Sequence, residues 1–308
     1  MKRRSFLFLA LLCALSVVFS AAQGSAKEWK ARILRNITYK TTDEQEIKLN
    51  IALPEDSEGN LREGAPLFVW IDSGCWYSKG PGTGGFWGHF GLISRGCAVA
   101  SVATRSLENV CFPAQIEDVK AAIRFLRAHA DEYKIDKNRI CVSGASSGGH
   151  LANMLSMSDE QRIFDVGDNL EESSQANVVI NFYGPTDFVN AVSRKICTSC
   201  IYPALGDPKV HGRTMDDVTP ELLEAAKKYS PITYVTEKTA PTFTLHGAMD
   251  TTVGLSQAAL YNEALRLAKV RCKLFISNTG VHSIQTLGSK DELGSMIFEF
   301  IGWDEVKE

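Results

Sequence analysis

Short apolar runs that alternate with helical patterns constrain the fold of this chain most strongly. Each run is bounded by polar or turn residues and is apolar almost throughout, as in strands that are buried on both faces. They are Leu67–Ile71, Ala98–Ala103, Arg139–Val142, Val178–Phe182, Thr242–Leu245 and Cys272–Ile276. Ile33–Tyr39 and Ile47–Leu53 precede them as an opening pair of strands. This order predicts an α/β fold with a mostly parallel central sheet and helices on both faces.

An amphipathic helix is predicted after Pro113, which is placed to open it. Its apolar residues recur at helical spacing, at Ile116, Val119, Ile123 and Leu126. The charged residues between them predict a solvated face, formed by Glu117, Lys120, Arg124 and Arg127. Near the end of the chain, Ser289 and Glu292 have the spacing of a capping box and predict the start of a last helix.

Residues 190–235 break this rhythm. The stretch holds a cysteine pair and a short helix that Thr219-Pro220-Glu221 would open. Its apolar content is too low for a core of its own. We therefore predict a small lid-like insertion over the end of the sheet, not a separate domain.

The first 26 residues have the pattern of a secretory signal. Lys2, Arg3 and Arg4 form a basic start, and the apolar run Phe6–Phe19 is short for a membrane span. Small residues follow, as cleavage requires, and an uncleaved anchor is the alternative. We expect a mature domain over residues 27–308, secreted or periplasmic after cleavage, with no stable membrane insertion.

Composition narrows the possible partners. The 308 residues carry a net charge of −3, from 33 basic and 36 acidic side chains, so no basic excess exists to bind nucleic acid.

Cys197 and Cys200 could form a tight disulfide in a loop, or they could stay free. A zinc site would need a second pair of ligands, which His211 alone does not supply. Cys141 lies in an apolar run and is expected to be a buried small hydrophobe. We expect no metal; the sequence does not define the oligomeric state.

The strongest motif is Gly144-Ala145-Ser146-Ser147-Gly148. A predicted strand enters it and an apolar helix, Leu151–Met157, leaves it, which is the context of a strained turn that exposes a nucleophilic serine. A plain glycine-rich βα turn is the alternative, and a phosphate-binding loop would need a Gly-Lys-Ser/Thr ending that is absent. Ser146, at the centre of the glycine frame, is the predicted nucleophile.

A serine hydroxyl needs a base, which an acid orients. After turns of this kind the acid follows the serine along the chain and the histidine follows the acid. Asp250, at the end of a predicted strand, leaves only His282 as the base. Asp187 is the competing acid, and His150, one turn into the helix, is expected to pack or hydrogen-bond.

Backbone N–H groups must also stabilise the developing oxyanion. The N–H of Ser147, directly after the nucleophile, is one predicted donor. The loop after Leu67–Ile71 should supply the others, with Gly74 and Cys75 as candidates.

With these motifs the chain resembles the α/β-hydrolase superfamily. More narrowly it looks like bacterial carboxylesterases grouped with bifunctional feruloyl and acetylxylan esterases, near the hormone-sensitive-lipase-like enzymes. The resemblance covers most of residues 45–302 and implies a Ser146–Asp250–His282 triad. It rests on Pro113-Ala114-Gln115-Ile116-Glu117-Asp118, Gly144-Ala145-Ser146-Ser147-Gly148-Gly149-His150-Leu151-Ala152, Tyr183-Gly184-Pro185-Thr186-Asp187, Leu245-His246-Gly247 with Asp250, and His282.

Two positions depart from the family pattern. The oxyanion loop is usually His-Gly-Gly-Gly-Trp, whereas this chain has Asp72-Ser73-Gly74-Cys75-Trp76. Missing glycines restrict the loop, and the Asp72 carboxylate would repel a developing negative charge unless it points away. Ser147 stands where the subgroup typically has alanine, and it keeps the backbone donor.

The expected function is that of an exported serine carboxylesterase acting on a small-molecule or polysaccharide-linked ester. The resemblance implies acetyl or feruloyl groups on plant polysaccharide, and no cofactor. Trp76, Tyr77 and Trp87 could contact an aromatic acyl group or a sugar, or could instead pack as core. The alternatives are a serine peptidase of the same fold and a catalytically silent binding protein.

Overall fold

The protein is described from a computed structural model, over residues 28–77, 80–81, 91–194, 198–206 and 218–304. Within them, one eight-stranded sheet has the order β1-β2-β4-β3-β5-β6-β7-β8. The strands are β1 (Lys30–Thr41), β2 (Glu46–Glu55), β3 (Ala65–Ile71), β4 (Ala98–Val102), β5 (Ile135–Ala145), β6 (Val178–Phe182), β7 (Thr242–Gly247) and β8 (Cys272–Ser277). All the predicted strands form, with ends shifted by a few residues.

The direction of the strands follows the prediction. β1 pairs antiparallel with β2 and β2 antiparallel with β4, and every other neighbouring pair is parallel. β3 is buried along its whole length. Its alternate side chains enter two different cores, as expected of a strand covered on both faces.

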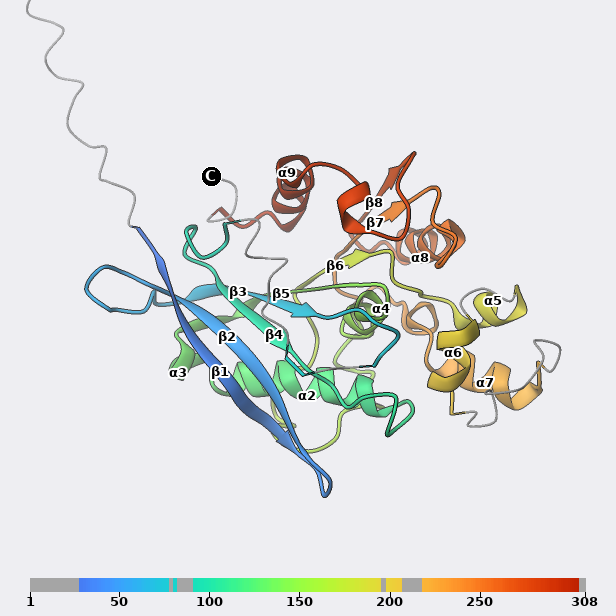
Figure 1. The fold of residues 1–308 in the computed structure, drawn as a ribbon, viewed down its shortest axis with the longest axis horizontal. Helices are drawn as coiled ribbons and strands as arrows, with labels where there is room; N and C mark the ends of the chain where they lie inside the picture. Colours follow the sequence, from blue (N-terminus) through green and yellow to red (C-terminus); the bar gives the residue numbers. More distant parts are fainter. Residues whose placement is uncertain (1–27, 78–79, 82–90, 195–197, 207–217, 305–308) are drawn as a thin grey trace, which may run out of the picture.

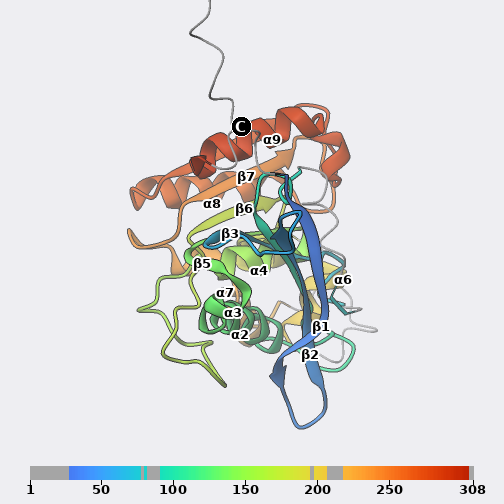
Figure 2. The same cartoon turned by 90° about the vertical axis from the view of Figure 1, so that its left-hand side faces the viewer.

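Helices cover both faces of the sheet (Figures 1 and 2). One face carries α2 (Ala114–Ala128), α3 (Ala130–Tyr133) and α4 (Ser147–Met154), and the other carries α9 (Lys290–Ile301). α8 (Leu255–Leu267) contacts β7 and β8. The predicted caps are confirmed, because Ser289 Oγ accepts the N–H of Glu292 at 3.2 Å and Pro113 is the N-cap of α2.

The predicted solvated face of α2 is wrong. Lys120 is 1% exposed and Arg124 is fully buried. The coil that follows α4 folds over this face and supplies Asp165, whose Oδ1 lies 2.7 Å from Arg124 Nη1 and 3.5 Å from Lys120 Nζ. Arg127 is buried as well and donates to the Gln175 carbonyl at 2.6 Å. Helical spacing separates charged from apolar residues, but it does not reveal that a distant coil brings a buried carboxylate.

Within the described residues, the predicted insertion consists of short helices, and its α-helices cluster together in Figure 1. They are α5 (Phe188–Ser193), α6 (Thr198–Ala204), α7 (Pro220–Lys228) and the 3₁₀ turn η1 (Pro231–Tyr234). Thr219 caps α7 through a 3.2 Å bond from the Leu222 N–H, as its sequence predicts. Ile201 and Ala204 of α6 are buried in the same core as α2 and α4, so the insertion shares the main core.

The cysteines differ in part from expectation. Cys200 forms a disulfide with Cys75, 125 residues away, and not with Cys197, which lies outside the described residues. The pairing arises because α6 lies beside the loop after β3, a proximity that local spacing cannot show. Cys141 is fully buried, as predicted.

The N-terminal segment predicted as a signal lies outside the described residues. Among the helices of the described part, none is both long enough and apolar enough to cross a membrane.

Candidate active site

The turn between β5 and α4 presents Ser146 in a strained backbone conformation. Its φ is 54° and its ψ is −121°, outside the regions that side chains ordinarily allow. The Ser146 N–H donates to the Phe182 carbonyl at 2.9 Å, and its carbonyl accepts the His150 N–H at 3.0 Å. A Cβ at Gly144 would collide with the Gly148 backbone, and one at Gly148 would collide with the Ile71 carbonyl. Gly144 therefore lets the turn fold closely on itself, and Gly148 lets it lie directly against the end of β3.

The predicted triad residues are hydrogen-bonded in a chain. His282 Nε2 lies 2.9 Å from Ser146 Oγ, and His282 Nδ1 lies 2.7 Å from Asp250 Oδ2. Asp250 follows β7 and His282 follows β8. Because β5, β7 and β8 run parallel, their carboxyl ends share one edge of the sheet, and the three side chains meet there.

Asp250 is held as a carboxylate. Its Oδ1 accepts the N–H groups of Thr252 and Val253, each at 2.9 Å, and its side chain is fully buried. Burial alone would raise the pKa of Asp250, but the bond from His282 and these backbone donors together lower it below its usual value. The ionised carboxylate accepts the Nδ1 proton of His282, so Nε2 is the ring atom that can accept the Ser146 proton.

The competing residues have other partners. Asp187 caps α5, with its carboxylate accepting the Asn190 N–H at 2.9 Å. His150 is fully buried, and its Nε2 lies 2.8 Å from the Tyr229 carbonyl. Its Nδ1 accepts the Trp76 indole N–H at 3.2 Å. Burial lowers the pKa of His150 to about 4, so the ring is neutral near pH 7. His150 is a hydrogen-bonding residue, as predicted.

Several residues that support the site were not singled out in the sequence. A Cβ at Gly247 would collide with the Gly280 carbonyl, so glycine allows the loops of Asp250 and His282 to pack backbone against backbone. Met249 N–H also donates to that carbonyl at 2.9 Å. The ring of Tyr183 lies 4.5 Å from the His282 ring, centroid to centroid. The quoted motifs contain Gly247 and Tyr183, but nothing local reveals their contacts.

The predicted oxyanion loop lies beside the turn that carries Ser146. Ile71, the last residue of β3, pairs with Gly144 of β5. The loop then passes through three left-handed residues, Gly74 (φ 116°), Cys75 (φ 53°) and Trp76 (φ 63°). The Trp70 indole donates to Asp72 Oδ1 at 2.6 Å, which holds that carboxylate toward β3.

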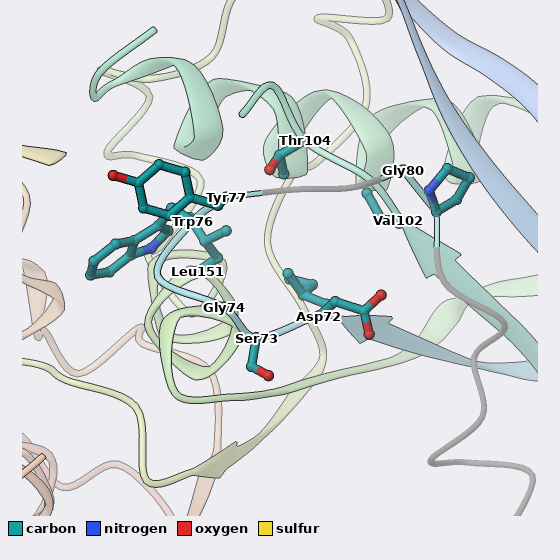
Figure 3. A pocket seen from close by; sticks show the side chains of 11 residues that line it. Asp72, Ser73, Gly74, Trp76, Tyr77, Gly80, Val102, Thr104 and Leu151 are labelled. Carbon is teal, nitrogen blue, oxygen red and sulfur yellow. The ribbon is translucent and has the colours of Figure 1, made fainter. Parts of the chain in front are cut away.

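A cavity of about 640 Å³ borders this loop (Figure 3). Asp72, Ser73, Tyr77, Thr104 and Leu151 are among its lining residues. Trp76 also lines it, but it is 4% exposed and packs in the core, with its indole bonded to His150. Tyr77 is thus the more accessible of the two predicted substrate-binding aromatics that the structure describes, and Trp87 lies outside the described residues.

Comparison with known proteins settles the family. The BD-FAE family model matches residues 49–265, which is more than half of the chain. The chain belongs to the BD-FAE family. The α/β-hydrolase fold and the esterase-family resemblance predicted from the sequence are thereby confirmed.

Individual curated proteins and solved structures are also similar to the chain. Esterase LipC of Mycobacterium tuberculosis is 29% identical over 204 residues, covering 66% of this chain and 48% of that protein. The chain thus spans about half the length of the curated relatives that it matches first. A bifunctional GH43-CE protein of Bacteroides eggerthii is 28% identical, with a TM-score of 0.70, over 89% of this chain and 35% of that one. A carbohydrate esterase from gut microbiota shares the fold, with a TM-score of 0.70 and 23% identity over 92% of this chain and 98% of that one.

Proposed function

We propose that this protein is a serine hydrolase of carboxylic esters. The observation that carries the proposal is the continuous hydrogen-bond chain from Ser146 through His282 to Asp250. A strained serine, an oriented imidazole and a buried carboxylate are the parts that acyl transfer requires. The esterase relative and the BD-FAE family membership support the same reaction.

In the proposed first half-reaction, Ser146 Oγ attacks the ester carbonyl while His282 Nε2 takes its proton. Asp250 stabilises the imidazolium that forms. The backbone N–H groups of Ser147, Gly74 and Cys75 hold the oxyanion of the tetrahedral intermediate. His282 then protonates the leaving alcohol, and an acyl group remains on Ser146.

In the second half-reaction, water attacks the acyl-enzyme. His282 takes a proton from that water as the new bond forms, and the same N–H groups hold the second oxyanion. The proton returns to Ser146 Oγ as the carboxylic acid leaves. Each step uses only groups of this chain, the ester and water.

We further propose esters of carbohydrates as the substrate class, with acetyl and feruloyl groups as the acyl candidates. The Bacteroides eggerthii relative, whose name joins a GH43 part to a CE part, supports a carbohydrate context. So does a 26% identical stretch of endo-1,4-beta-xylanase B from Butyrivibrio fibrisolvens, which covers 61% of this chain and 26% of that protein. The cavity beside Tyr77, Thr104 and Asp72 offers an aromatic face and hydrogen-bonding groups for a ring with hydroxyls.

The test of ester hydrolysis compares the wild-type protein with Ser146→Ala. We expect a fluorophosphonate probe to label Ser146 and p-nitrophenyl acetate to be hydrolysed by the wild type alone. Ser143→Ala, which removes a buried hydroxyl from the same strand three residues before Ser146, is the matched control and should keep both properties. A folded wild type that neither reacts with the probe nor hydrolyses any short ester would refute the proposal and favour a silent binding protein.

A substrate panel then separates the finer alternatives. Acetylated xylo-oligosaccharide, a feruloylated sugar, p-nitrophenyl butyrate and a chromogenic peptide would be compared by kcat/KM. We expect the sugar esters to be preferred. Preference for the peptide would instead identify a peptidase of the same fold.

We also propose that the protein is exported. The basic and apolar start of the chain supports export, as does the Cys75–Cys200 disulfide, which forms in oxidising compartments. N-terminal sequencing of protein recovered from outside the cytoplasm should begin near residue 27; intact protein retained in the cytoplasm would contradict export.

A further inference from the structure

The oxyanion loop holds an unfavourable backbone conformation next to the nucleophile. Cys75 and Trp76 are consecutive non-glycine residues with φ of 53° and 63°. Non-glycine residues with such φ values are strained and persist only where their surroundings enforce the conformation. The usual family loop gives no explanation for this conformation, because it has glycine where this chain has Cys75.

Noncovalent contacts hold the Trp76 side of the loop. Its indole N–H donates to His150 Nδ1 at 3.2 Å, and its carbonyl accepts the Leu107 N–H at 3.1 Å. His150 belongs to α4, the helix that starts directly after Ser146. Trp76 is therefore tied to the same helix that carries the nucleophile turn.

The Cys75 side is held covalently. Cys75 forms the disulfide with Cys200 of α6. α6 is itself fixed to the body of the protein, because Ile201 and Ala204 are buried in the main core and the Ala204 carbonyl accepts the Phe112 N–H at 3.0 Å. Cys200 thus connects the loop to a helix that is packed into the main core.

We propose that Cys200 is a positioning residue that acts through its disulfide to keep the Cys75 N–H directed at the oxyanion. The inference rests on the proposed ester hydrolysis and deepens it, since it makes turnover depend on the disulfide. A dithiol reductant would supply two electrons and two protons, break the S–S bond into two thiols and become a cyclic disulfide itself. Both cysteines are partly exposed, so such a reductant can reach the bond.

The first experiment compares Cys200→Ser with Cys111→Ser in p-nitrophenyl acetate hydrolysis, at a temperature where both variants are folded. Cys111 is a free, partly exposed cysteine next to Phe112, so it controls for loss of a thiol near α6. Removal of one oxyanion-hole donor lowers kcat by a factor of about 10²–10³. Displacement of the Cys75 N–H should therefore lower kcat by about tenfold or more. We expect that fall in kcat for Cys200→Ser, with KM unchanged within about twofold, and no change for Cys111→Ser.

Reduction and rescue test the mechanism itself. Dithiothreitol should lower the kcat of the wild type to that of Cys200→Ser, leave Cys200→Ser unchanged, and be reversed by reoxidation. In the double variant Cys75→Gly/Cys200→Ser, glycine adopts a positive φ without strain, so part of the lost kcat should return.

The outcomes separate this inference from the proposed function. An inactive wild type refutes ester hydrolysis itself, whatever the disulfide does. If the wild type is active but Cys200→Ser only lowers the melting temperature and keeps its kcat, the disulfide is merely structural and the inference is overturned. A double variant no more active than Cys200→Ser, or peptide mapping that finds no Cys75–Cys200 link, would also overturn it.

Discussion

Replacement of Asp250 by asparagine should disable the base while leaving the site nearly unchanged in shape. Oδ1 of Asp250 accepts two backbone N–H groups, from Thr252 and Val253, and Oδ2 accepts the proton of His282 Nδ1. An asparagine would keep its single carbonyl oxygen toward the two backbone donors. Its NH₂ group would then face His282 Nδ1, which must become an acceptor, so the ring proton moves to Nε2. That tautomer cannot take a proton from Ser146.

The size of the loss in kcat follows from the free energy needed to turn the asparagine amide the other way round. To restore the active tautomer, the amide must flip and leave the N–H groups of Thr252 and Val253 without an acceptor, at about 1–3 kcal/mol for the buried Val253 and about 1 kcal/mol for Thr252, whose residue is exposed. The total of about 2–4 kcal/mol corresponds to a loss of about 30-fold to 10³-fold in kcat, at 1.36 kcal/mol for each factor of ten. We expect a loss in the upper part of this range, because the flipped amide would also point its NH₂ group at the N–H groups of Thr252 and Val253.

The assay is the kcat of p-nitrophenyl acetate hydrolysis near pH 7.5, with folding checked by thermal melting. Asp187→Asn is the matched control, because the Asp187 carboxylate caps α5 by accepting the Asn190 N–H and does not belong to the Ser146–His282–Asp250 hydrogen-bond chain. It should keep kcat within about threefold of the wild type. An Asp250→Asn protein with kcat within about tenfold of the wild type would refute the assigned role of the carboxylate.

Three further predictions concern stability. Asp165→Asn should lower the free energy of unfolding in urea by about 3–5 kcal/mol, because it leaves the fully buried Arg124 without its anion; a loss below about 1 kcal/mol would contradict this. Gly247→Ala should lower the melting temperature and kcat together, because its Cβ would force the Gly280 backbone away; unchanged kcat would mean that this contact does not position the triad loops. The pKa of His150 is lowered to about 4, so the unfolded chain binds the extra proton first and stability falls as the pH drops from about 6.5 toward 4. His150→Gln should remove about 2–3 kcal/mol of this fall between pH 7 and 4.5, and an identical pH dependence in both proteins would exclude the effect.

Much of the site was predictable because its parts are local. A strand, a glycine-framed turn and a helix identify Ser146, since only small residues permit that turn to approach β3. The chain order of acid and base then leaves His282 as the only histidine after Asp250. The sequence favours Asp250 over Asp187 as the acid, and the hydrogen bond between Asp250 and His282 supports this prediction.

Local patterns alone thus define the strands, the parallel sheet and the nucleophile turn, because backbone conformation and burial leave a periodic mark on neighbouring residues. Contacts between distant segments leave no such mark. The burial of Lys120 and Arg124 depends on a coil that carries Asp165, and the partner of Cys200 is a residue 125 positions earlier. Those pairings exist only once the sheet and its helices have packed, so only the tertiary structure reveals them.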